Sequence, residues 1–465
     1  MIFSRPLPSL FFLAFLSTGV FLCGLPESGW AQDADADGIL DTTETSIGSN
    51  RLRKDVFVQC NYMQIDFNAD GDGLDRGEHS HRMSTTAVQQ LTQIFSSAPV
   101  PNPGLGCQGG PQNGRACSSS AICEGFPCSR TGITLHIEQT PLQFPQPPPQ
   151  LEQRFLDFTS RKGGPNFFDL KAINFNFATR ASYYRYCILA HDAGEEMGSA
   201  SGQAEILGND FMLTLGAWPN ETGLPVGKVT DQIGTFLHEI GHTFGLEHGG
   251  GGPLPAEARI ENYKPNYVSG MNYFFQVLGI RSNTGIRFDF SRAALPTLNE
   301  EALNEGVGIQ DGGADFTRFF CPDFPMRTKV SSGAIDWNCS GAMTAGVVAN
   351  PNGDRTFQAL PLRNTLEGYN DWDNLKFSFT TSPLYDAGAG VGFGQHRANL
   401  GAYKPVAMTV GHGIDREPEA TLPGGRCQEF LSISQTRITQ GLRFQTHLFS
   451  QADTDRNGVG DSCER

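Results

Sequence analysis

The chain has 465 residues, of which 38% are hydrophobic and 18% charged. That composition excludes a disordered chain, and the absence of any fixed glycine period excludes a collagen-like one. The net charge of −15, with no cluster of lysine and arginine, argues against a nucleic-acid partner. The acidity gathers in short Asp-rich loops, which favours bound cations.

The first 31 residues have the features of an export signal. Arg5 precedes an apolar run from Leu10 to Cys23, and small residues stand three and one positions before a cleavage site after Ala31. The apolar run is shorter than the roughly 20 residues that cross a bilayer, and no later run is longer. We therefore expect a secreted or cell-surface protein without a transmembrane span.

Two segments have the spacing of a twelve-residue calcium loop, with oxygen ligands at positions 1, 3, 5, 9 and 12 and glycine at position 6. The first lies in residues 32–50 and contains Asp33, Asp35, Asp37, Asp41 and Glu44, with Gly38 at the bend. The second lies in residues 421–465 and contains Asp453, Asp455, Asn457, Asp461 and Glu464. Both resemble thrombospondin type-3 repeats, so Ca²⁺ is the expected ligand; a solvated acidic turn is the alternative. A third candidate, Asp66 to Asp72, lacks the final carboxylate.

Between the signal and residue 215, the hydrophobic pattern predicts one helix and several strands. Apolar residues at helical spacing predict a helix at 85–95. Apolar or alternating runs predict strands at 54–62, 132–138, 183–189 and 209–215. This order of elements is typical of an α/β or α+β fold.

Ten cysteines remain after the signal, an even number that suits an oxidising compartment. Four of them lie in a polar insert, residues 102–130, and predict a small disulfide knot whose connectivity stays open: Cys107, Cys117, Cys123 and Cys128. A four-cysteine zinc site is the alternative for this insert. Outside it, Cys321 with Cys339 and Cys427 with Cys463 are local pairs, which leaves Cys60 and Cys187 to pair by elimination.

The most informative stretch is Gln232 to His248, which begins as a helix with one apolar face that Thr230 or Asp231 can cap. His238 and His242 are one turn apart, so their imidazoles project from the same face and can bind one zinc ion. Glu239 points to the side, where it can act as general base toward a zinc-bound water. A turn at Gly245 would bring back His248 as a third ligand and leave one position open, as in catalytic zinc sites.

This HExxHxxGxxH pattern, followed by Met271 in Ser-Gly-Met, resembles the metzincin clan of zinc metalloendopeptidases over residues 52–275. The resemblance implies a mixed twisted sheet with a zinc-site helix, and a protein or peptide substrate. It also implies that Met271 forms the floor of the zinc site and that Tyr273 stabilises the transition state. A substrate would pair with an edge strand, for which residues 209–215 are the candidate.

We accordingly expect a catalytic domain at 51–420, with a loop-rich subdomain after the methionine turn, at 275–420. Two other functions stay open: a non-proteolytic calcium-binding surface or matrix protein on a protease-like scaffold, and a zinc hydrolase of another substrate, such as a peptidoglycan amidase. The sequence leaves the oligomeric state open. The other histidines have no recognisable ligand spacing and are expected to be ordinary surface or core residues: His79, His81, His136, His191, His396, His412 and His447.

Overall fold

The computed structural model describes residues 32–65, 78–145, 155–158, 161, 164–194, 200–310, 313, 315–322, 326–353, 364–382 and 384–385, and the backbone of 431–438 and 441–448. Several predictions lie outside these residues. They are the export signal, the third calcium candidate, the second calcium loop and the Cys427–Cys463 pair.

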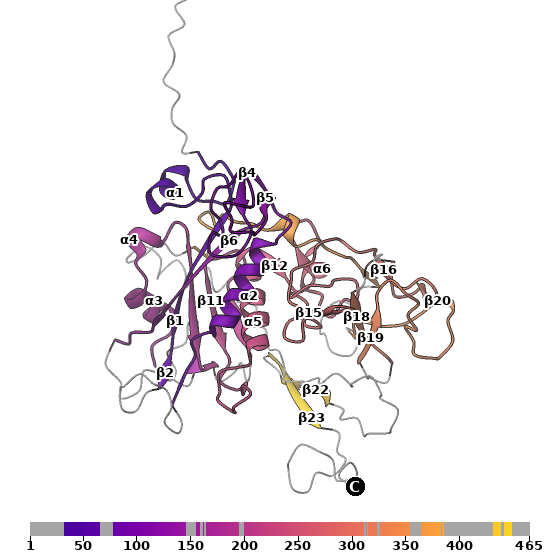
Figure 1. Ribbon diagram of the computed structural model, residues 1–465. Coiled ribbons are helices and arrows are strands. Elements are labelled where there is room, and N and C mark those ends of the chain that lie inside the picture. Colours follow the sequence, from indigo (N-terminus) through magenta and orange to yellow (C-terminus); the bar gives the residue numbers. More distant parts are fainter. Residues whose placement is uncertain are drawn as a thin grey trace, which may run out of the picture.

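A five-stranded sheet with the order β10-β11-β8-β1-β6 forms the centre of the molecule (Figure 1). Its strands are β1 (Asp55–Tyr62), β6 (Thr134–Pro141), β8 (Tyr184–Ala190), β10 (Gly202–Ala204) and β11 (Asp210–Thr214). All neighbours are parallel except β10, which runs antiparallel to β11. β1, β8 and β11 are buried along their whole length, as expected of parallel strands covered on both faces. The mixed α/β fold and four predicted strands are thus confirmed.

Helices cover both faces of this sheet (Figure 1). On one face lie α2 (Thr85–Ser96) and α5 (Val229–Thr243), which contact each other and share a large apolar core with the sheet. On the other lie α3 (Phe167–Asn174) and α4 (Phe177–Arg180), with a second core rich in phenylalanine. The predicted helix at 85–95 is confirmed as α2, and the Ser84 side chain caps it by accepting from the Ala87 amide.

The edge strand differs from the expectation. Residues 209–215 form β11, but β11 lies inside the sheet between β8 and β10, so it has no edge for a substrate. The edge is β10, only three residues long, with the sequence Gly-Gln-Ala. A strand of three residues without β-branched side chains has no alternating hydrophobic pattern. For this reason the sequence favoured the more apolar neighbour, β11, as the edge strand.

Three disulfides are present among the described residues: Cys107–Cys123, Cys117–Cys128 and Cys321–Cys339. The first two settle the connectivity of the insert and exclude the four-cysteine zinc site. The insert joins β4 (Pro101–Cys107) to β5 (Cys128–Thr131).

The predicted Cys60–Cys187 disulfide is wrong, because both residues are buried free thiols. They stand directly opposite each other on parallel strands β1 and β8. Strands lie about 4.8 Å apart with side chains pointing the same way, whereas a disulfide needs Cβ atoms about 3.8 Å apart. Burial raises the pKa of the Cys187 thiol well above its usual value.

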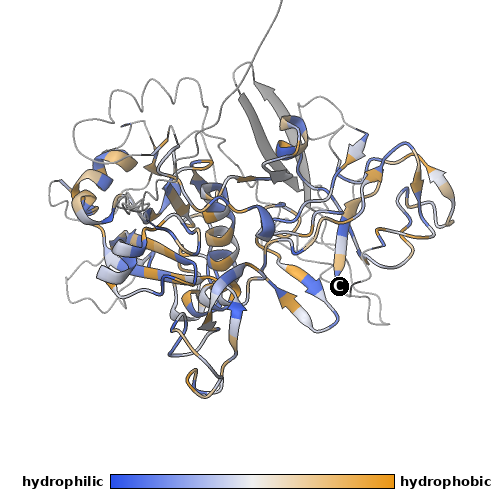
Figure 2. Cartoon of the chain, turned by 90° about the horizontal axis from the view of Figure 1, so that it is seen from above, coloured by the Kyte–Doolittle hydropathy of each residue, from blue (hydrophilic) through white to orange (hydrophobic). Residues whose placement is uncertain are grey.

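After α5 the chain forms short hairpins that extend to one side of the sheet (Figures 1 and 2). A separate apolar cluster around Trp337 holds part of this region together. No helix among the described residues has the length and apolar character of a membrane span. The remaining elements are α1 (Asp41–Ile47), β2 (Gln64–Ile65), β3 (His79–Ser80), β7 (Phe155–Leu156), β9 (Asp192–Ala193), β12 (Leu246–Glu247), β13 (Gly250–Gly251), α6 (Ala256–Ile260), β14 (Ile280–Ser282), β15 (Gly285–Arg287), β16 (Leu298–Asn299), β17 (Leu303–Asn304), β18 (Phe316–Phe320), β19 (Met326–Val330), β20 (Ala345–Val347), β21 (Thr365–Leu366), η1 (Trp372–Asn374), β22 (Leu431–Ile438) and β23 (Gly441–Leu448).

Candidate active site

The predicted zinc-site helix is α5, which begins at Val229, a little earlier than expected. Asp231 lies in its first turn and accepts from the Lys228 amide at 2.9 Å. The helix ends at Thr243, and Gly245 then adopts a φ of +83°, which reverses the chain into the β12–β13 hairpin. His248 lies in the turn of this hairpin, so the tight reversal returns it to the helix.

The three predicted ligands converge. One ring nitrogen from each of His238, His242 and His248 lies within 4.8 Å of the others, and all three residues are buried. The Nε2 atoms of His238 and His242 are 3.2 Å apart, close to the separation of about 3.3 Å that two nitrogens have around a tetrahedral zinc ion. Their Nδ1 atoms lie 2.9 and 2.8 Å from the carbonyl oxygens of Gly270 and Leu246, which leaves Nε2 free for a metal.

The electrostatics of this triad suit a cation. Burial lowers the pKa of His238 and His248 well below the usual value and that of His242 to about 4, so the imidazoles are neutral, the form that binds metals. His248 Nε2 is buried and has no hydrogen-bond partner among the described residues. A buried nitrogen of this kind is costly without a partner, and a zinc ion would supply one.

Glu239 follows His238 in α5, and its side chain lies against the sheet edge. Only 1% of it is exposed, and a Cβ on Gly202 of β10 would lie 2.7 Å from its Oε1. Burial raises its pKa well above the usual value, and its Oε2 has no partner among the described residues. The carboxylate can therefore take up a proton next to the strand edge where a peptide could lie.

The methionine turn packs directly under α5. A Cβ on Gly241 would lie 2.3 Å from the Met271 Sδ, so only glycine between the two helix ligands allows this close contact. Met271 is fully buried, as the resemblance implies for a floor residue. No pattern in the sequence singles out Gly241.

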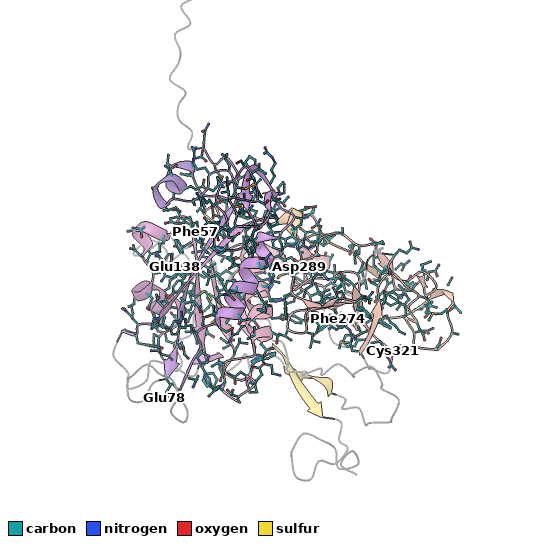
Figure 3. All side chains as sticks on the ribbon, in the orientation of Figure 1. Phe57, Glu78, Glu138, Phe274, Asp289 and Cys321 are labelled. Atoms are coloured by element: carbon teal, nitrogen blue, oxygen red, sulfur yellow. A yellow bond between two sulfur atoms is a disulfide. The ribbon has the colours of Figure 1, made fainter. Side chains whose placement is uncertain are left out.

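Asp371 holds the methionine turn in place, and the sequence reasoning missed it. Its carboxylate accepts from the Tyr267 hydroxyl at 2.6 Å, from Ser269 Oγ and from the Ser291 amide. Next to it, Trp372 Nε1 donates to Asp289, which is labelled in Figure 3. The motif Tyr-Asn-Asp-Trp-Asp at 369–373 marks the position, but its partners are about 80 to 100 residues away and no local spacing connects them.

Tyr273 lies next to two of the ligands. Its ring centroid is 4.4 Å from that of His248 and 5.6 Å from that of His238. Its amide donates to Asn262 Oδ1 at 3.0 Å, which fixes the backbone. The hydroxyl is desolvated, which raises its pKa well above the usual value, so it remains a hydrogen-bond donor at neutral pH.

The described calcium loop folds as a compact acidic site. Two overlapping groups can hold a metal ion: Asp33, Asp35 and Asp37, and Asp37, Glu44 and Asp55. Gly38 adopts a φ of +89°, the bend that position 6 requires. The amides of Asp37 and Gly38 donate to Asp33, whereas both carboxylate oxygens of Glu44 are buried without a partner among the described residues. Burial raises the pKa of Asp35 and Glu44 to about 8 and that of Asp37 to about 7.

Two details of this loop differ from the expectation. Asp41, at position 9, bonds the Ala34 amide at 2.9 Å and begins a following helix, α1. The loop precedes the domain expected at 51–420 but is tied to it, since Asp37 Oδ2 accepts from the Asp55 amide at the start of β1. Asp55 was absent from the predicted ligands because it lies outside the loop.

A second histidine cluster was also missed. His79, His81 and His191 were expected to be ordinary residues, but their ring nitrogens lie within 4.8 Å of one another. The available signal was His-Ser-His, since residues two apart in a strand share a face.

No protein-family model, curated protein or solved structure matches the chain. The metzincin resemblance therefore rests on its motif alone.

Proposed function

We propose that this protein is an exported zinc-dependent endopeptidase of the metzincin type, which hydrolyses peptide bonds within proteins or peptides. The observation that carries the proposal is the convergence of three buried imidazoles, His238, His242 and His248, on the helix that also carries the buried carboxylate of Glu239 or just after it. Zinc held there would supply Lewis acidity and lower the pKa of a water molecule to about 7.

Residues of the chain supply the remaining catalytic roles. Glu239 takes the proton from the attacking water and passes it to the leaving amine. Tyr273, next to His248, donates its hydroxyl to the developing oxyanion. The neutral histidines keep their ligating nitrogens available because their other nitrogens bond backbone carbonyls.

Strand β10 is the substrate-binding edge in this proposal. It pairs with β11 on one side, and the described residues place no strand on the other. An extended peptide can add there through main-chain hydrogen bonds, whatever its side chains. Gly202 of β10 touches Glu239, so a peptide bound along this edge lies close to the general base.

We further propose that Ca²⁺ binds the loop formed by Asp33, Asp35, Asp37, Asp41 and Glu44, where it joins the N-terminal segment to β1. The unpartnered oxygens of buried Glu44 support a hard cation at this position. The three disulfides are consistent with an extracellular site of action.

The test is hydrolysis of casein and of a broad quenched-peptide library. We expect the wild type to cleave internal bonds, to lose this activity with a zinc chelator and to regain it with Zn²⁺. Glu239→Gln should keep its zinc and lose about 10²–10⁴-fold in kcat. The matched control is Glu257→Gln, an exposed glutamate in α6, which should cleave at the wild-type rate.

Hydrolysis that persists in Glu239→Gln at equal zinc content would contradict the proposal. A zinc-loaded wild type that cleaves no peptide would favour the calcium-binding scaffold instead. Cleavage of peptidoglycan alone would favour the amidase.

A further inference from the structure

We propose that His79, His81 and His191 form a second metal site, for a divalent transition metal such as Zn²⁺, which joins the β2–β3 hairpin to the end of β8. The proposal is independent of the peptidase function.

The geometry of this cluster matches that of the α5 triad. His191 Nδ1 and His81 Nε2 are 3.2 Å apart, the same separation as between the two helix ligands. The three ring centroids are 5.0, 5.2 and 5.5 Å apart, against 4.7, 5.2 and 5.4 Å at α5. Three imidazoles with nitrogens this close suit zinc, copper or nickel.

The backbone holds each histidine in place. His79 lies in β3, where it pairs with Ile65 of β2, and the His81 amide donates to the Met63 carbonyl at 3.0 Å, just after β1. The His191 carbonyl accepts from the Gly216 amide at 2.7 Å, just after β11. The donors are therefore arranged by the sheet before any metal binds, which lowers the entropic cost of binding.

The surroundings also favour a cation. His79 and His81 are 7% and 6% exposed, whereas His191 is half-buried, so the site is shielded from bulk water on the side of the first two. The Asp192 carboxylate lies 4.0 Å from His191 Nε2, the ring nitrogen that does not face His81. This distance is too long for a hydrogen bond, but the negative charge favours a cation held by the ring.

The cluster lies where separate strands end. It follows β8 and β11 at their carboxyl ends, a common position for ligand sites in open α/β sheets. Glu78, which precedes His79, is labelled at the lower end of the sheet in Figure 3. The two triads share no ligand, and we assign the second one to holding the strand ends together.

The test is zinc per chain by mass spectrometry, for protein purified in the presence of Zn²⁺. We expect two zinc ions in the wild type, one in His191→Gln, one in His238→Ala, and none in the double variant. His81→Ala is a second variant that removes a ligand of the same site. The matched control is His136→Gln, since His136 Nε2 lies 2.6 Å from Asp55 and belongs to neither triad; it should keep both ions.

Thermal unfolding tests whether metal bound at the second site stabilises the fold. Zn²⁺ added to metal-free His238→Ala should raise its Tm, because a ligand that binds only the folded state stabilises it. The same addition should leave the Tm of the double variant unchanged.

Each other result has a defined meaning. One zinc in the wild type that His238→Ala loses and His191→Gln keeps would overturn the second site, with His81 and His191 then sharing only an N–H···N hydrogen bond. One zinc with the opposite pattern would overturn the peptidase site and keep this one. Two zinc ions that both persist in His191→Gln and His81→Ala would also overturn the proposal.

Discussion

The two histidine triads have similar internal geometry, but they come from different parts of the sequence and have different neighbours. One spans eleven residues from His238 to His248, so a single helix and one turn place all its ligands. The other takes ligands from β3, the residues after it, and the end of β8. Each triad has a buried glutamate next to a ligand in sequence, Glu239 at the first and Glu78 at the second. Among the described residues, the methionine floor and the β10 edge lie by the first. Ligands alone hold a metal, whereas catalysis needs these neighbours as well.

The largest effect is expected at the contact that only the α5 triad has. In Gly241→Ala the new methyl group would meet the Met271 sulfur and the Phe290 ring in a fully packed region. Overpacking of this kind costs about 1–3 kcal/mol. We expect the α5 zinc to be lost and hydrolysis to fall by about 10²-fold or more, while the second triad keeps its zinc.

Zinc content and peptide hydrolysis measured on the same samples check this prediction. Gly306→Ala is the control, because Gly306 is exposed and its added Cβ meets only a side-chain oxygen at 3.4 Å. Normal hydrolysis in Gly241→Ala would show that the close packing of the methionine turn is unnecessary.

A smaller loss is expected in Tyr273→Phe. The ring stays next to His248 but the donor is removed, so kcat should fall about 10²-fold with little change in KM. Steady-state kinetics on one quenched peptide would measure both constants. An unchanged kcat would mean that Tyr273 only packs against the ligands.

Asp371→Asn should have a still smaller effect on catalysis. The substitution removes a charged acceptor shared by Tyr267, Ser269 and Ser291, at a cost of about 1–3 kcal/mol. Because Ser269 adjoins Gly270, whose carbonyl orients His238, we expect hydrolysis to fall about 10-fold. Urea unfolding together with kinetics would separate the two effects, and a stable variant with wild-type kinetics would exclude a positioning role.

The smallest effect concerns the calcium loop and pH. Burial raises the pKa of Asp35 and Glu44 to about 8, so without metal the folded chain holds protons that the unfolded chain releases above about pH 4. Stability of the metal-free protein should therefore fall as pH rises from about 4 to 8. Ca²⁺ should reverse this trend, because it favours the ionised carboxylates.

Thermal unfolding of Glu239→Gln with EGTA or with Ca²⁺ would show this effect without self-cleavage. Glu44→Gln should lose most of the calcium response. A Tm that rises with pH in EGTA, or does not respond to Ca²⁺, would contradict the assignment.

Features built from residues close in sequence were the predictable ones. The convergence of the α5 triad and of the first acidic loop was predicted because their residues lie within one turn or one loop; the role of Glu239 and the binding of Ca²⁺ stay predictions. The long apolar strands were found because burial on both faces leaves a continuous run. Residues that the fold brings together from far apart were missed, among them Asp55, Asp371 and His191.

The pairing of Cys60 with Cys187 by elimination was also wrong, because strand geometry decides whether two cysteines can bond. Cys60 and Cys187 were paired because they were left over, but their positions on adjacent parallel strands keep them as thiols. The substrate edge was assigned to the more apolar strand, although β10 reaches the edge by reversing direction after β8. The hydrophobic pattern of a sequence indicates which residues are buried. Which strand lies at the edge of the sheet depends on the strand order, which the pattern does not contain.

The most direct test of the central claim is a crystal structure with anomalous diffraction recorded on both sides of the zinc absorption edge. We expect a zinc peak about 2.0–2.1 Å from one nitrogen each of His238, His242 and His248, and a second peak among His79, His81 and His191. An α5 triad without zinc, in crystals grown with Zn²⁺, would contradict the claim that this chain is a zinc peptidase.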